Sequence, residues 1–432
     1  MVKRLLGVLV TVLFLMTLAW PAVAADKFSI GGEYRAWFIT DKDADYNSDE
    51  DDDAEYIKQR LRVGLTFTPN ENLTVFTRID WAEGVWGQDF NDWNGWASAK
   101  EGSEIGVDYA WAQVKKGIFS AKVGSHWSGT ANYILWDQDG TGITIDLATP
   151  VAVKVNYTKA NEGSGSGDST DDDPTTPDVN ENDKDIDLYG VYVGYSGDKF
   201  GVNLTGATRQ DDSEADASPW AVGVQFTAKL GMVALNLEVD QFGGTAGELD
   251  VVGTQAYLDL GANFTKSFKC GLRGVYAMGT DDLTSEVQYT SIQAGAETFS
   301  PFGFEGAMIW YPWGAAGYPF GVNTYSGNFG VGDLAGPFDP AGASAGVMGF
   351  CPYINVAASD ALKFYGKVAY VTPQEDANTS LDNQTAVVLE ADYLIFGNMT
   401  LSAGYIYQKP EFDDDTPSDP RQLMIAQLKV DF

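Results

Sequence analysis

Apolar and polar residues alternate one by one through much of the chain, in runs of about ten residues separated by turn-forming segments. In residues 220–230 the apolar positions are Trp220, Val222, Val224, Phe226, Ala228 and Leu230. Successive side chains of a β-strand point to opposite faces, so these runs predict strands with one apolar and one polar face. About twenty runs can be counted, including irregular ones at 286–299 and 302–311.

The connections between the runs alternate between short and long. Two-faced strands also occur in water-soluble sandwiches, so alternation alone does not choose between a sandwich and a barrel. Short turns on one side and long loops on the other are typical of outer-membrane barrels, as are aromatic residues at strand ends. We therefore predict an all-β fold: a single transmembrane antiparallel β-barrel of about 18–20 strands, with short periplasmic turns and long acidic extracellular loops. The predicted loops lie near 40–55, 83–106, 126–141, 159–186, 210–218, 242–250, 279–285, 312–345, 372–384 and 409–421.

The first residues have the three parts of a secretory signal peptide. Lys3 and Arg4 precede an apolar run, which ends in the small residues at 22–25. We expect residues 1–24 to be removed and residues 25–432 to form the barrel. No later segment has the eighteen or so continuous apolar residues of a helical membrane anchor.

The last strand ends in Phe432, preceded by alternating apolar positions at 424, 426, 428 and 430. This ending resembles the assembly signal of Gram-negative outer-membrane barrels. The segments FSIGGEYRAW (28–37) and QRLRVGLTF (59–67) resemble porins of sulfate- or metal-reducing bacteria. The resemblance implies a water-filled pore in the outer membrane of a Gram-negative bacterium, insertion by the barrel-assembly machinery, and a possible homotrimer. It identifies no solute.

The chain is strongly acidic, with 61 Asp and Glu, 27 Lys and Arg, and a net charge of −34 over 432 residues. Nucleic acid is excluded as a partner, because its phosphates require a basic surface. The segments 41–55, 162–185, 211–216 and 411–419 hold 27 of the acidic residues. Such runs are typical of solvated loops, and divalent ions could bridge them to lipopolysaccharide phosphates.

The predicted lumen has the opposite balance. A Lys or Arg side chain that faces lipid at the middle of the bilayer destabilises a barrel by about 2–4 kcal/mol. The polar face of each strand should therefore point into the lumen. Alternation then places fourteen basic and nine acidic residues in the lumen, among them Asp108. A compact group on the first three strands should line the pore and shape its selectivity: Glu33, Arg35, Lys58, Arg60, Arg62, Arg78 and Asp80. The alternative is that the acidic residues neutralise the arginines in a structural ladder.

Two loops rich in aromatic residues, 83–106 and 312–345, are candidates to fold into the pore. In the first, the possible constriction residues are Trp86, Asp89, Phe90, Asp92, Trp93 and Trp96. The loop after the first strand has oxygen ligands at the spacing of a calcium loop, at Asp41, Asp43, Asp45, Asn47, Asp49 and Asp52. It lacks the glycine and the final glutamate of that motif, so a solvated loop is the stronger interpretation. No other cofactor is expected.

Signals of an enzyme are nearly absent. His126 is the only histidine, with no nucleophile-elbow pattern around it, and the two cysteines show no metal or haem spacing. We therefore predict a porin that admits small hydrophilic solutes and ions by passive diffusion. The alternatives are a substrate-selective channel for sugars or for organic or inorganic anions, with an aromatic loop path, and a structural or adhesive surface protein whose acidic loops are its functional part.

Overall fold

The computed structural model describes residues 27–43, 48, 54–81, 84–85, 106–129, 135–161, 185–211, 217–280, 284–288, 345–375, 381–413 and 418–432. The strands are β1 (Phe28–Lys42), β2 (Ala54–Asn70), β3 (Leu73–Asp80), β4 (Gly84–Val85), β5 (Gly106–Lys116), β6 (Phe119–Gly129), β7 (Asp137–Leu147), β8 (Val151–Asn161), β9 (Ile186–Ser196), β10 (Phe200–Asp211), β11 (Trp220–Leu230), β12 (Val233–Gly243), β13 (Thr245–Ala246), β14 (Leu249–Thr265), β15 (Phe268–Ala277), β16 (Glu286–Gln288), β17 (Val347–Ala357), β18 (Leu362–Thr372), β19 (Leu381–Phe396), β20 (Met399–Phe412) and β21 (Arg421–Asp431).

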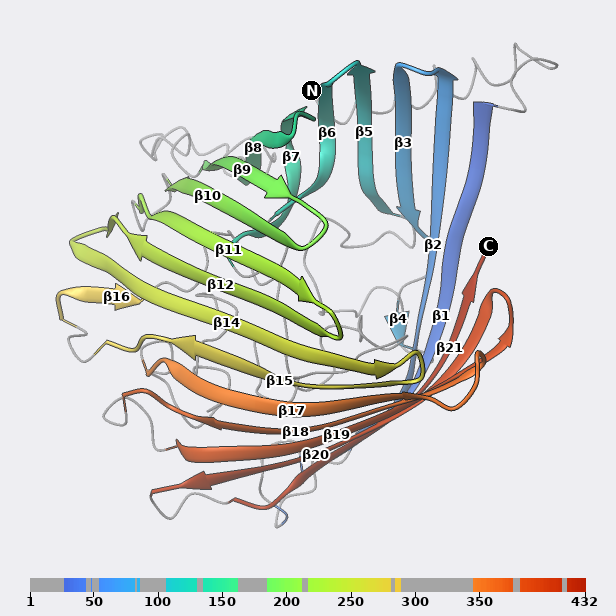
Figure 1. Cartoon of the computed structure of the whole chain (residues 1–432), viewed down its shortest axis with the longest axis vertical. Coiled ribbons are helices and arrows are strands. Elements are labelled where there is room, and N and C mark those ends of the chain that lie inside the picture. Colours follow the sequence, from blue (N-terminus) through green and yellow to red (C-terminus); the bar gives the residue numbers. More distant parts are fainter. Residues whose placement is uncertain are drawn as a thin grey trace, which may run out of the picture.

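Eighteen long strands form one closed antiparallel barrel (Figure 1). Each pairs with the next along the chain, and β1 closes the ring on β21, from the pair Glu33–Asp431 to the pair Lys42–Gln422. The short strands β4, β13 and β16 are additions beside β2 and β14. The predicted fold class is confirmed.

Of the two irregular runs at 286–299 and 302–311, the structure describes only residues 286–288. β15 pairs directly with β17, from Phe268–Val356 to Ala277–Val347, which leaves no place between them. Glu286–Gln288 forms the short β16, which pairs parallel with β14, and residues 289–311 lie outside the described part of the chain. The described ring closes with eighteen strands, at the lower end of the predicted 18–20.

The connections keep the strict alternation of the sequence. Eight are tight turns, such as Gly117–Ile118 and Gly397–Asn398, and β1 begins and β21 ends on the same side as these turns. The connections on the other side are longer, with the longest between β15 and β17. Among the helices of the described residues, none is long and apolar enough to cross a membrane.

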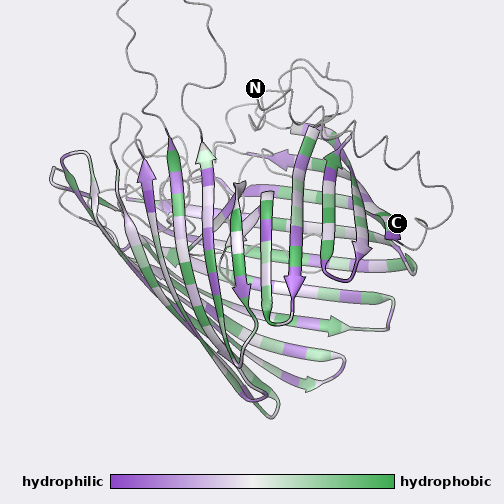
Figure 2. Ribbon diagram, turned by 90° about the horizontal axis from the view of Figure 1, so that it is seen from above, coloured by the Kyte–Doolittle hydropathy of each residue, from purple (hydrophilic) through white to green (hydrophobic). Residues whose placement is uncertain are grey.

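The outer face of the barrel is apolar. Large hydrophobic side chains such as Phe38, Val224 and Leu272 are exposed on it at every second position, and Figure 2 shows the resulting alternation of hydropathy along the strands. This row faces lipid, because apolar residues of a membrane barrel cover the hydrocarbon core. The intervening residues face the lumen.

The inner face is not uniformly polar, contrary to the simple rule that polar residues face inward. Towards the long-loop end of β1 and β19–β21, the inward residues form a buried apolar cluster of Trp37, Ile39, Val388, Ile406, Leu423 and Ile425. Two further clusters lie on the inner face of β9–β14 and β14–β19. In these regions both faces of the wall are apolar, although charged pairs also occur at the long-loop end.

A buried ion pair closes the seam between the first and the last strand. Arg421 at the start of β21 donates from Nε to Asp41 Oδ1 at 2.9 Å and from Nη2 to Asp41 Oδ2 at 2.6 Å. Both side chains are buried. The two parallel bonds fix the register of β1 against β21 at the long-loop end.

Candidate pore and selectivity site

Four arginines of the predicted pore lining lie on adjacent strands at mid-height. Arg35 lies on β1, Arg60 and Arg62 on β2, and Arg78 on β3, and the register sets Arg35 opposite Arg60 and Arg62 opposite Asp80. All four project inward with Glu33 and Asp80, because they occupy the row opposite the lipid-facing one. The four arginines, Glu33 and Asp80 therefore lie on one inner patch.

Each arginine of this patch contacts a carboxylate. Glu33 bridges two of them, through Oε2 to Arg35 Nη2 at 2.7 Å and Oε1 to Arg60 Nη2 at 2.8 Å. Arg62 Nε lies 2.9 Å from Asp80 Oδ1, and its Nη2 lies 3.6 Å from Asp108 Oδ2. We call these four arginines and three carboxylates the arginine ladder.

Asp108 completes the ladder from β5. Its carboxylate also accepts a hydrogen bond from Arg78 Nε, and the Arg78 guanidinium carbon lies 3.9 Å from the centre of the Tyr109 ring. A register shift opposite Arg78 and Ile79 brings Asp108 and Tyr109 together at this point. The structure has the arrangement of the neutralising alternative, with one positive charge in excess within the ladder.

A second set of basic residues lies near the short-turn end of the lumen. Lys122, Lys154, Lys229, Lys269 and Lys363, here called the lysine tier, each lie within a few residues of a short turn on an inward position. None of the five forms an ion pair within 4.0 Å in the described part of the chain. Lys122 and Lys269 instead lie over aromatic rings, 4.9 Å from the Trp111 centroid and 5.0 Å from that of Tyr353. Positive charge is therefore less compensated here than in the arginine ladder.

Leu135 and Trp136, just before β7, lie against the inner face of strands further along the wall. Leu135 and Trp136 are fully buried and pack against Leu188, Ala207, Ala221, Phe242 and Val251, which lie on β9–β14. Gly190 and Gly223 make room for them, because a methyl group at Gly190 would overlap the Trp136 ring and one at Gly223 would meet Leu135. These two side chains therefore occupy space on the lumenal side of β9–β14.

The sequence did not single out this pair as a constriction element. Two apolar residues in a polar connection are a weak signal, and glycines in the middle of strands were the other available hint. The residues that were singled out, Trp86, Asp89, Phe90, Asp92, Trp93 and Trp96, lie outside the described residues, as does the 312–344 segment.

His126 has a structural environment within the wall. Its Nδ1 donates to the Gly124 carbonyl oxygen at 2.8 Å, and its Nε2 shares a hydrogen bond of 2.8 Å with the Thr144 hydroxyl. Thr144 in turn donates to Asn156 Oδ1 at 2.8 Å. These contacts link β6, β7 and β8 across the inner face.

The proposed calcium ligands are only partly described. Both oxygens of Asp41 accept hydrogen bonds from Arg421, so this carboxylate already has a partner of opposite charge. Asp43 has a positive φ of 54°, and Asp45, Asn47, Asp49 and Asp52 lie outside the described residues. Ser48 of the same loop donates to Asp419 Oδ2 through its hydroxyl at 2.6 Å and its backbone N–H at 3.1 Å, which lowers the pKa of Asp419.

The chain terminus is tied to the first strand. The Gly32 N–H donates to the Phe432 carbonyl oxygen at 2.8 Å, and the Phe432 N–H donates to Gly32 O at 3.0 Å. The Phe432 side chain is exposed on the outer face beside Gly32.

Solved structures with the same architecture identify the fold. The chain is similar to OccAB2 of Acinetobacter baumannii, with a TM-score of 0.56 and 12% identity over 95% of this chain and 99% of that one. It is also similar to OpdK of Pseudomonas aeruginosa with vanillate, with a TM-score of 0.56 and 9% identity over 95% of this chain and 100% of that one. A BenF-like porin of Pseudomonas fluorescens has a TM-score of 0.55 and 10% identity, over 94% of this chain and 99% of that one. The chain has the fold of the outer-membrane porins. No protein-family model matches the sequence, and no curated protein is detectably similar to it.

The porin fold places the protein in the outer membrane of a Gram-negative bacterium. The apolar outer row and the absence of wall edges agree with this location, because a closed ring satisfies every backbone group of the wall within the bilayer.

Proposed function

We propose that the protein is an outer-membrane channel through which small hydrophilic solutes and ions diffuse passively. The observation that carries the proposal is the row of ionised side chains on the inner face of a closed eighteen-stranded ring. A barrel of this size is too wide for side chains to fill. Charged walls of this kind favour an aqueous path, because burying unsolvated charges would be far more costly.

Ion selectivity is expected to depend on the walls and not on the net charge of the chain. The excess of positive charge in the ladder and the lysine tier favours anions, since rings and walls of charge set the selectivity of pores. The strongly acidic segments were assigned to external loops, where their charge is screened by salt over about 8–10 Å.

Planar-bilayer recordings test the channel and its walls together. In a KCl gradient, we expect the wild-type protein to give discrete current steps. Asp108→Asn should shift the zero-current potential further towards that of the anion, because it removes the carboxylate shared by Arg62 and Arg78. Asp198→Asn, in the turn between β9 and β10, is the matched control and should leave the potential unchanged. Equal zero-current potentials for all three proteins would show that the arginine ladder does not determine ion selectivity. The absence of any current would contradict the proposal that the protein is a channel.

A substrate-selective channel is the second candidate. OpdK, solved with vanillate, has the same fold, and the lysine tier favours anionic solutes over neutral ones. Saturable block of the current by one organic anion would favour this candidate. The third candidate, a structural or adhesive surface protein, depends on acidic loops that lie largely outside the described residues.

Further parts of the proposal come from the sequence alone. We propose that residues 1–24 are removed on export, that Phe432 contributes to recognition by the barrel-assembly machinery, and that the external loops contact lipopolysaccharide with or without calcium. A homotrimer and a closer relation to porins of sulfate- or metal-reducing bacteria are proposals of the same kind.

A further inference from the structure

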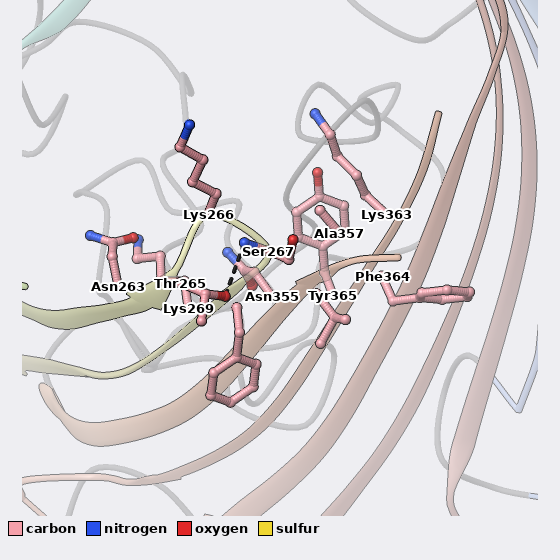
Figure 3. A pocket seen from close by; sticks show the side chains of 12 residues that line it. Asn263, Thr265, Lys266, Ser267, Lys269, Asn355, Ala357, Lys363, Phe364 and Tyr365 are labelled. Carbon is pink, nitrogen blue, oxygen red and sulfur yellow. Dashed lines mark hydrogen bonds between the residues drawn. The ribbon is translucent and has the colours of Figure 1, made fainter. Parts of the chain in front are cut away.

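A small cavity of about 180 Å³ lies at the short-turn end of the lumen. It lies where the β14–β15 turn meets the ends of β17 and β18, far from the arginine ladder on β1–β5 in the strand order. Figure 3 shows Lys266 and Lys363 extending to the same side of the wall and Phe364 to the other. The cavity therefore opens on the inner side, beside the path of any solute that leaves the lumen.

The lining of this cavity is basic. Lys266, Lys269 and Lys363 contribute three ammonium groups, and no Asp or Glu lines the cavity. None of the three lysines forms an ion pair within 4.0 Å in the described ranges. Lys266 and Lys363 are exposed to solvent.

Acidic residues also lie on the strands around the cavity, among them Glu390, which stands opposite Tyr365 in the register of β18 and β19. Asp259 accepts a hydrogen bond from the Tyr353 hydroxyl at 2.8 Å and contacts Arg273 Nε at 3.3 Å. Asp392 stands opposite Lys363 in the register of β18 and β19, and it accepts a hydrogen bond from the Ser402 hydroxyl at 2.5 Å. Asp360 lies in the turn between β17 and β18 and does not line the cavity. Among the described residues, none of these carboxylates comes within 4.0 Å of an ammonium group of the cavity.

The remaining polar lining suits an oxyanion. Hydroxyl groups come from Thr265, Ser267 and Tyr365, and amide groups come from Asn263 and Asn355. Ammonium groups act as compact point charges with rotatable donors, and three of them around one cavity match a ligand with more than one negative charge. The volume is below the roughly 300–1,000 Å³ of pockets for drug-sized ligands, which limits the ligand to a few heavy atoms.

We propose that this cavity is a binding site for a small polyvalent oxyanion of the phosphate or sulfate type. The site holds the anion by three ammonium groups and by hydroxyl and amide donors, without a metal. If the protein conducts as proposed above, the anion bound here lies at the periplasmic exit of the channel. Binding itself does not depend on conduction.

Equilibrium dialysis with inorganic phosphate tests the site on the folded barrel in detergent. We expect saturable binding of one phosphate per chain at low ionic strength. Lys269→Gln with Lys363→Gln should weaken this binding by about tenfold or more, because two of the three charges are removed. Lys266→Gln, an exposed turn residue whose replacement leaves the strands intact, should weaken it as well.

The control is Lys115→Gln with Lys116→Gln, two lysines at another short turn that do not line the cavity. This variant should bind phosphate as the wild type does. Equal binding in the cavity variants, an equal loss in the control, or no saturable binding in the wild type would overturn the proposal. A barrel that binds phosphate but conducts no ions would contradict the proposed channel and leave the phosphate site intact.

Discussion

Trp136→Ala is expected to increase the single-channel conductance and to destabilise the barrel. The indole is fully buried against the inner wall, so its loss releases the β6–β7 connection from β9–β14 and widens the lumen. Truncating a buried tryptophan costs about 3–5 kcal/mol. Conductance in planar bilayers and the free energy of unfolding in urea measure the two effects.

A second variant removes the same contact from the other side. Gly190→Ala places a methyl group in the space of the Trp136 ring, so it should displace the connection and increase the conductance too. Gly206→Ala on β10 is the matched control, because a methyl group there meets no atom within 4 Å. Unchanged conductance in both Trp136→Ala and Gly190→Ala would show that this connection does not narrow the conducting path.

Arg421→Gln should lower the free energy of unfolding by roughly 3–5 kcal/mol, because it leaves the buried Asp41 carboxylate without its bidentate partner. The loss should appear at the seam, where β1 and β21 close the ring last in chain order. Urea unfolding of the refolded barrel in detergent, followed by tryptophan fluorescence, measures it.

The double variant Asp41→Asn with Arg421→Gln separates the ion pair from the packing around it. Since neither residue then carries a buried charge, this variant should recover much of the lost stability. A double variant as unstable as Arg421→Gln alone would show that the uncompensated charge is not the cause.

The sequence was sufficient to predict the barrel because the physics of the wall is local. Each strand has one row of residues that faces lipid and one that faces the lumen. Residues 220–230, which form β11, show this alternation already in the sequence. Residues 286–288 differ from the prediction, because they form the short β16 beside β14 and not a strand of the wall. Direct pairing of β15 with β17 depends on residues far apart in the chain, which a local pattern does not contain.

The candidate site was predictable in its members but not in its contacts. Alternation brought Arg35, Arg60, Arg62 and Arg78 to one inner patch, yet the sharing of Asp108 depends on the register shift opposite Arg78. The position of Leu135 and Trp136 depends on two glycines on distant strands. Side-chain chemistry was thus visible in the sequence, whereas the pairing that compensates each charge required the three-dimensional register.

Permeation of neutral sugars into liposomes tests the central claim most directly. Liposomes that contain the refolded protein should swell in isotonic sugar solutions, at rates that fall as the sugar becomes larger, because a water-filled lumen separates solutes by size. Empty liposomes give the background. Swelling no faster than this background, from protein shown to be folded and inserted, would contradict passive diffusion through the barrel.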